Sequence, residues 1–162
     1  MKFQAKNEIQ NFSFDDAVIE ELKIAGSDIS FSLKGAVVKA DNSQNARYQD
    51  MACGAIVLQL ENAEIVRVIK EGYKYYDADG KLMDEVPNTD VPAVEQSSVI
   101  KRCGAGTIFT IVSGEYEGNL LYEFGIDVPK QEDGEEVDTY WLCIRFENSI
   151  VSWERYLGPE SD

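Results

Sequence analysis

The chain has 162 residues, of which 44% are hydrophobic and 10% aromatic, and it carries a formal net charge of −15. This length and composition predict one folded domain over residues 1–162, with a core that needs neither disulfides nor a metal. The chain has no histidine, so the usual proton shuttle near neutral pH and the commonest metal ligand are both missing. We therefore expect no metal site, no cofactor and no catalytic centre, and so a protein that is not an enzyme.

Acidic residues concentrate in the second half, where residues 82–162 hold 5 Lys or Arg against 17 Asp or Glu. Such a negative field repels nucleic acid and anionic lipid and attracts cationic surfaces. We expect neither a nucleic-acid partner nor a membrane partner. A basic protein is the partner that the charge favours, and solubility alone is the alternative explanation of the acidity.

A reducing cytoplasm is the expected compartment. The first eight residues are polar and mixed, and no apolar run approaches the ~18 residues that span a bilayer. Cys53, Cys103 and Cys143 form no CxxC pair and have small or apolar neighbours. These features predict buried thiols that behave as small hydrophobic groups.

Alternation of apolar and polar residues predicts strands along most of the chain, whereas a sustained helical period is hard to find. Before residue 18, Asp15 could cap a helix, but the β-branched pair Val18-Ile19 favours a strand. The expected strands in chain order are residues 18–24, 29–34, 55–60, 65–69, 73–76, 81–83, 107–112, 120–128, 140–146 and 150–156.

Three pairs of consecutive strands have turn residues between them and are predicted hairpins. The first turn is 25–28, and the last is 147–149. The middle turn is 77–80, where Gly80 can take the positive φ that closes a hairpin. Its two aspartates suggest a calcium loop only weakly, because the rest of a twelve-residue ligand series is missing.

Residues 84–92 carry two prolines and three acids, which predicts a loop that caps a sheet edge. Residues 94–101 are compatible with a short helix or with the lead into a strand. Alternation along 120–128 places Leu120, Tyr122, Phe124, Ile126 and Val128 on one face. The predicted core comprises Ile29, Phe31, Leu33, Tyr122, Phe124, Ile126, Leu142 and Ile144.

These elements predict a mainly β fold with little helix and about eight to ten strands. A single antiparallel β-sandwich or a partly open barrel accommodates such a series of short strands and turns.

Carboxylate doublets are frequent, but neighbouring residues of a strand point to opposite faces, so a doublet is not a glycosidase pair. Cys103 follows two basic residues, yet no histidine could serve as its base. Arg145 and Arg155 are expected to pair with acids across strands. The aromatic residues fit either a core or a recognition surface; those in question are Tyr73, Tyr75, Tyr76, Trp141 and Trp153.

The segment 132–138 holds five acids in seven positions and must be solvated, because a buried cluster of this kind could not ionise. If the protein captures a cationic partner, this loop should steer the association. A flexible, solubilising loop is the alternative. The predicted partner-binding residues are Asp127, Glu132, Asp133, Glu135, Glu136 and Asp138.

Three segments together resemble a family of small uncharacterised Firmicutes proteins, sometimes labelled subtilin-biosynthesis sensor proteins. They are Phe12-Ser13-Phe14-Asp15-Asp16-Ala17, Val38-Lys39-Ala40-Asp41-Asn42-Ser43-Gln44-Asn45 and Ile150-Val151-Ser152-Trp153-Glu154. The opening segment also resembles the Phe-x-Phe-His-Asp-Ala start of small β-rich proteins grouped with toxin-immunity proteins. Asp15 stands where those proteins have histidine.

Together these observations favour a non-enzymatic binding or interaction protein, such as an acidic inhibitor or an immunity-type protein that covers a basic partner. The alternative is a small-ligand-binding or carboxylate-based enzyme domain with a cleft in a β-sandwich. A deep pocket lined by converging acids and aromatic residues would favour the alternative.

Overall fold

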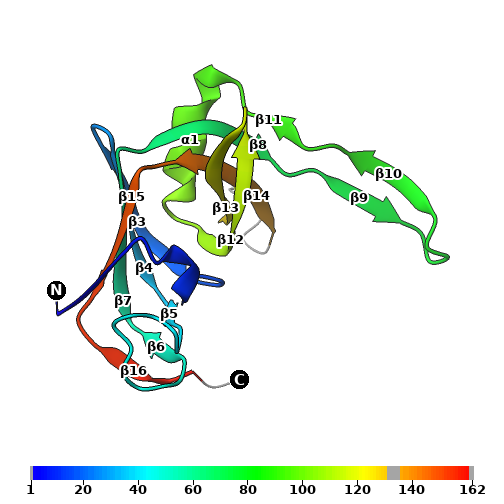
Figure 1. The fold of residues 1–162 in the computed structure, drawn as a ribbon. Coiled ribbons are helices and arrows are strands. Elements are labelled where there is room, and N and C mark those ends of the chain that lie inside the picture. Colours follow the sequence, from blue (N-terminus) through cyan, green and yellow to red (C-terminus); the bar gives the residue numbers. More distant parts are fainter. Residues whose placement is uncertain (1, 131–135, 161–162) are drawn as a thin grey trace.

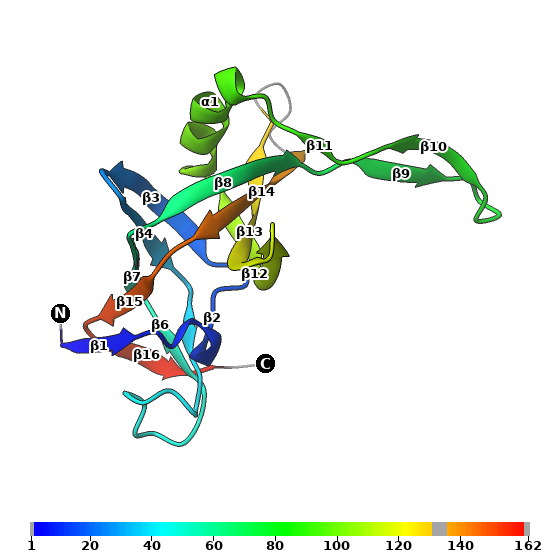
Figure 2. The same cartoon turned by 45° about the horizontal axis from the view of Figure 1, so that its top comes forward.

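The computed structural model describes residues 2–130 and 136–160 and confirms the mainly β fold, with 59% strand and 9% helix. One antiparallel sheet of ten strands dominates the molecule and is not closed into a barrel. The sheet bends so that its two halves pack their apolar faces together, as in a sandwich (Figures 1 and 2).

The first half of the large sheet has the order β1 (Phe3–Lys6), β15 (Asn148–Trp153), β7 (Ala55–Glu61), β4 (Asp28–Lys34) and β3 (Val18–Ala25). The second half continues with β12 (Thr107–Tyr116), β13 (Asn119–Pro129), β14 (Val137–Arg145), β8 (Glu64–Lys70) and β11 (Thr89–Asp90). A smaller sheet has the order β16 (Tyr156–Pro159), β6 (Met51–Cys53), β5 (Val37–Val38) and β2 (Phe12–Ser13). The remaining elements are β9 (Tyr73–Tyr76), β10 (Leu82–Val86), the 3₁₀ turn η1 (Ile9–Asn11) and the helix α1 (Ala93–Cys103).

A long two-stranded ribbon connects the two halves. β7 pairs with β15 in the first half, and β8, which follows β7 in the chain, pairs with β14 in the second. The backbone N–H of Glu147 donates to the carbonyl of Glu61 over 3.0 Å at the bend. The paired strands therefore pass together from one half to the other. Elsewhere the halves meet between β3 and β12, where Thr107 is paired with Val18.

The core lies between the two halves. Phe31 of β4 and Phe124 of β13 stack with ring centroids 5.2 Å apart and nearly parallel planes. Helix α1 packs against β13 and β3, and its Cys103 is fully buried. Seven of the eight predicted core residues are buried, and Tyr122 is half-buried against the same cluster.

Leu120 lies beyond the core, although alternation along β13 places it on the same face as Tyr122 and Phe124. Leu120 is 67% exposed, whereas its neighbour Leu121 is buried. This start of β13 belongs to the end of the β12–β13 hairpin, where Leu120 pairs with Glu115, and the strand enters the core only further along.

The predicted hairpin between residues 140–146 and 150–156 is wrong. β14 and β15 follow each other across the bend of the ribbon, and each pairs with strands distant in sequence. The residues between them have turn character, but the chain uses them to change from one half of the sheet to the other. The two other predicted hairpins are confirmed as β3–β4 and β9–β10.

The segment predicted as an edge loop is more regular than expected. Residues up to Val86 continue β10, and β11 adds two residues to the edge of β8. Pro87 lies between these strands, and Pro92 is the N-cap of α1. Both prolines therefore mark element boundaries, where a missing N–H is tolerated. The open choice for residues 94–101 is settled as helix.

Truncating one ring of the Phe31–Phe124 stack should show how much the core between the two halves contributes to the free energy of unfolding. Phe31→Ala removes a fully buried ring and is expected to lower the free energy of unfolding by about 3–5 kcal/mol. Val94 is 93% exposed, so Val94→Ala should change it by less than about 0.5 kcal/mol. Urea unfolding followed by circular dichroism measures both, and similar losses would contradict a core centred on Phe31.

Candidate interaction surfaces

The predicted partner-binding acids come from two strands and the connection between them. Asp127 lies on β13, Glu136 immediately precedes β14, and Asp138 lies on β14. The other three predicted residues, Glu132, Asp133 and Glu135, lie outside the described residues.

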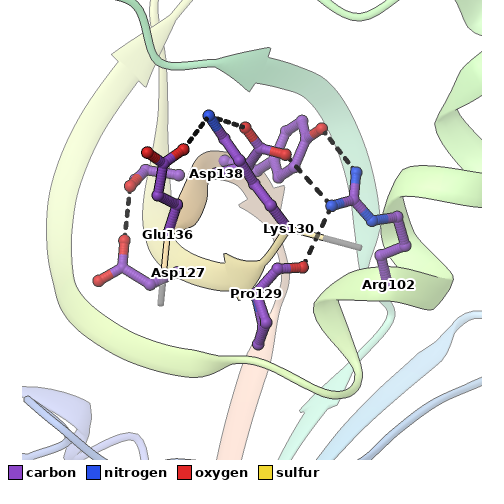
Figure 3. A network of polar contacts seen from close by, with 8 residues as sticks. Arg102, Asp127, Pro129, Lys130, Glu136 and Asp138 are labelled. Atoms are coloured by element: carbon purple, nitrogen blue, oxygen red, sulfur yellow. Dashed lines mark hydrogen bonds and ion pairs between the residues drawn. The ribbon is translucent and has the colours of Figure 1, made fainter. Parts of the chain in front are cut away.

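Asp138 is held by a basic side chain from α1 (Figure 3). Arg102 Nη2 donates to Asp138 Oδ2 over 3.2 Å, and Arg102 Nη1 donates to the hydroxyl of Tyr140 over 3.1 Å. The guanidinium also lies over the Tyr140 ring, 5.7 Å from its centroid. Only 26% of the Arg102 side chain and 16% of the Asp138 side chain are exposed. This ion pair therefore fixes the helix to the sheet, and Asp138 is largely occupied within the chain.

Lys130 neutralises more of the same cluster. Its ammonium lies 3.3 Å from Glu136 Oε2 and 4.0 Å from Asp138 Oδ1. The hydrogen bond to Glu136, together with attraction by both carboxylates, raises the pKa of the Lys130 amine. Glu136 remains 62% exposed, so it is the member of this group that a partner could reach.

Asp127 points away from the Arg102 network, as Figure 3 shows. The Thr139 hydroxyl donates to Asp127 Oδ1 over 2.5 Å. Asp127 and Thr139 are paired residues of β13 and β14. Among the described acids of the predicted site, Glu136 and Asp138 therefore pair with basic side chains, whereas Asp127 accepts a hydrogen bond from Thr139 on the sheet.

The second candidate surface is the β9–β10 hairpin, which we call the arm, and it projects far from the rest of the molecule (Figures 1 and 2). Every residue of both strands is exposed. Six of these residues are large apolar or aromatic side chains: Tyr73, Tyr75, Tyr76, Leu82, Met83 and Val86. The tyrosine cluster that the sequence left open between core and recognition is therefore on the surface.

The ends of the arm are well defined. At the tip, Asp77 Oδ1 accepts hydrogen bonds from the backbone N–H groups of Asp79 and Lys81, each over 2.9 Å. At the root, Gly72 lies so close to the opposite strand that a Cβ there would be 1.8 Å from the Val86 carbonyl oxygen. The Gly72 N–H donates to Asn88 Oδ1 over 2.7 Å. The arm is therefore a regular hairpin with defined hydrogen bonds at its tip and at its base.

The three cysteines are free thiols and buried, as predicted. Burial raises the pKa of Cys53 to about 11, of Cys103 to about 12 and of Cys143 to about 11. The neighbouring Arg102 lowers the pKa of Cys103, but desolvation outweighs it. None of these thiols is in a setting that activates a nucleophile.

Surface depressions bear on the ligand-binding alternative. One of about 410 Å³ is lined by Arg102 and Tyr140 together with Lys70, Asp90 and Glu95, which mixes both charges. Another of about 270 Å³ contains Glu64 and Glu117 beside Tyr116. There Arg145 Nη2 lies 2.5 Å from Glu64 Oε2, and both side chains are more than half exposed. Neither depression brings carboxylates together in a place shielded from water.

Sequence reasoning missed Phe109 and Gly125, which lie on the outer face of the second half-sheet beside Trp141. The predicted hairpin of residues 140–146 and 150–156 would have put Trp141 and Trp153 on neighbouring strands. Trp153 is fully buried on β15, whereas Trp141 is half-buried on β14, which is not a neighbour of β15. A glycine within an otherwise apolar strand was the available signal, since it often marks a close approach.

Among residues 2–130 and 136–160, no three Cys, Asp or Glu side chains are grouped so that they could hold a metal ion. No helix in the described part of the chain is long and apolar enough to cross a membrane. Comparison of the chain with protein-family models, curated proteins and solved structures gives no match.

The buried and the exposed arginine pairs should differ in energy. Arg102→Met leaves the mostly buried Asp138 without its main partner and should lower the free energy of unfolding by about 1–3 kcal/mol. Arg145→Met breaks an exposed pair with Glu64 and should cost about 0.2–1 kcal/mol. Urea unfolding at pH 7 compares them, and equal losses would mean that the Arg102 pair does not fix α1.

The cysteines should react slowly in the native protein. At pH 8, Ellman's reagent is expected to label all three within seconds in urea but only slowly without it, because burial keeps them as thiols. Because burial raises the pKa of Cys53 and Cys143 to about 11, their contribution to the free energy of unfolding is complete below pH ~8.5. It is lost as the pH rises toward about 11, because the unfolded chain then ionises its thiols more readily. Fast native labelling of any one cysteine would contradict its burial.

Proposed function

We propose that the protein is a non-enzymatic interaction protein of the cytoplasm, an acidic inhibitor or immunity-type protein that covers a basic protein partner. The observation that carries this proposal is the arm, whose strands are exposed along their whole length. The resemblance of the Phe12–Ala17 segment to toxin-immunity proteins agrees with it.

An isolated two-stranded hairpin is at best marginally stable in water. In the described chain β9 and β10 form a sheet of their own, so their apolar side chains lack a core to pack on. Exposed apolar groups in one place are typical of a protein-binding surface. Tyrosine is moreover enriched among the residues that dominate binding energy. A partner protein would supply the missing packing.

The charge of the chain supports a basic partner. A formal charge of −15 accelerates encounter with a positive surface and discourages other acidic proteins. Among the described acids of the predicted site, Glu136 is 62% exposed and Asp127 points away from the Arg102 network. We propose that they assist association, while the arm supplies the packed contact.

Removing apolar groups from the arm should weaken partner binding without unfolding the protein. We expect Tyr75→Ser combined with Tyr76→Ser to reduce affinity roughly tenfold or more, because each truncated anchor of an interface can cost more than ~1 kcal/mol. The matched control is Tyr48→Ser, since Tyr48 is 91% exposed and outside the arm. The measurement is calorimetry with the purified partner, identified by cross-linking in cells and mass spectrometry.

A basic partner is expected, and its association should slow as salt is raised. An acidic partner, or one whose affinity falls equally with Tyr48→Ser and the arm variant, would contradict the proposal. Turnover of a small molecule that survives the arm substitutions would favour the enzyme alternative.

A further inference from the structure

An aromatic pair occupies the outer face of the second half-sheet, opposite the core. Phe109 of β12 is 42% exposed, and its ring centroid lies 5.5 Å from that of the half-buried Trp141 of β14, edge to face. The preceding residue, Ile108, and the residue after Trp141, Leu142, are fully buried on the inner face. Side chains alternate along strands, so both rings face outward.

Two local features create this pair. The pairing of β12 with β13 is irregular between Ile108 and Thr110, so Phe109 is the extra residue of a bulge, a feature that redirects a side chain. Between the rings lies Gly125 of β13, where a Cβ would be 2.8 Å from Phe109 Cδ1 and 3.0 Å from the Trp141 ring. The rings can therefore lie over the sheet only because residue 125 has no side chain.

Three carboxylates share this face with the rings or contact them. Glu123 and Asp127 lie two residues before and after Gly125, on the same face of β13. The Trp141 indole N–H donates to Glu71 Oε1 over 3.3 Å. Arg67 belongs to this face as well, where it pairs with Cys143, but its guanidinium is engaged by Asp90. The face thus combines exposed aromatic surface with an excess of negative charge.

We propose that this face, centred on Phe109 and Trp141, binds an arginine side chain of a basic protein segment. A guanidinium is attracted to the face of an aromatic ring and forms hydrogen bonds with carboxylates at the same time. Glu123 and Asp127 lie on this face of β13 and would accept those bonds, with Asp127 using the oxygen that Thr139 does not occupy. The inference rests on the proposed function, because it assigns a surface and a side-chain type to the same basic partner.

A short peptide tests the site without the partner. The probe is acetyl-Gly-Arg-Gly-Arg-Gly-amide, and its control replaces both arginines with citrulline, which has nearly the same shape but no charge. The chain has two tryptophans, so ¹H–¹⁵N spectra contain two indole signals. We expect the arginine peptide to shift the Trp141 signal saturably and to leave that of the fully buried Trp153 unchanged. The citrulline peptide should shift neither.

Variants distinguish binding at this site from general attraction by the negative charge of the protein. Phe109→Ala should weaken peptide binding roughly two- to fivefold, the amount expected for one exposed cation–π contact, and Gly125→Ala should weaken it by displacing both rings. Leu120→Ala removes an exposed side chain elsewhere on β13 and should leave binding unchanged. Glu123→Gln should weaken binding more than Glu21→Gln, although each removes one charge.

An unmoved Trp141 signal, equal shifts with the citrulline peptide, or equal effects of Glu123→Gln and Glu21→Gln would overturn the site. If Trp141 does not respond but an arm-dependent basic partner is found, the proposed function stands and this surface is wrong. If the arginine peptide binds at Trp141 but the partner from cells is not basic, the surface stands and the proposed function fails.

Discussion

One two-stranded ribbon joins the two halves of the sheet. In it, residues 55–70 stay paired with β14 and β15 while both segments bend. β7 with β15 and β8 with β14 are two parts of this ribbon, and the pairing continues across the bend, with one register shift between Cys143 and Ile144. The bend brings Phe31 opposite Phe124 and sets the position of β8, from which the chain continues into the arm. The core, the outer aromatic face and the root of the arm are consequences of the same pairing.

Local signals in the sequence predicted most strands and two hairpins, because alternation and turn residues act over a few positions. They failed at residues 147–149. A short polar connection with turn residues is compatible with a hairpin and equally with a bend between half-sheets, and only distant partners decide between them. Here Glu61 accepts the Glu147 N–H, a pairing between residues far apart in the chain that no local pattern reveals.

The candidate sites were predicted less well, for a related reason. The density of acids identified Asp138 as a candidate, but it could not show that Arg102 pairs with it. Arg102 lies on α1, and the sequence left that segment open between a helix and the lead into a strand. The sequence left the tyrosines of residues 73–76 open between a core and a surface, because Tyr, Leu and Met show the same pattern whether a hairpin packs on the sheet or projects from it. The tyrosines are exposed because the arm projects beyond the sheet. The role of Gly125 likewise depends on tertiary structure, because it is Phe109 and Trp141 that lie where its Cβ would be.

The arm also has two strand edges that pair with no other strand in the described chain. Such edges are templates for joining the edge of another copy, and charged side chains on them oppose this. The arm strands carry Lys74, Asp84 and Glu85, and the formal net charge of −15 adds repulsion between whole molecules at neutral pH. Near the isoelectric point of about 4.3 that repulsion disappears. At that pH we expect the unpaired edges of the arm to be the place where two copies would first join.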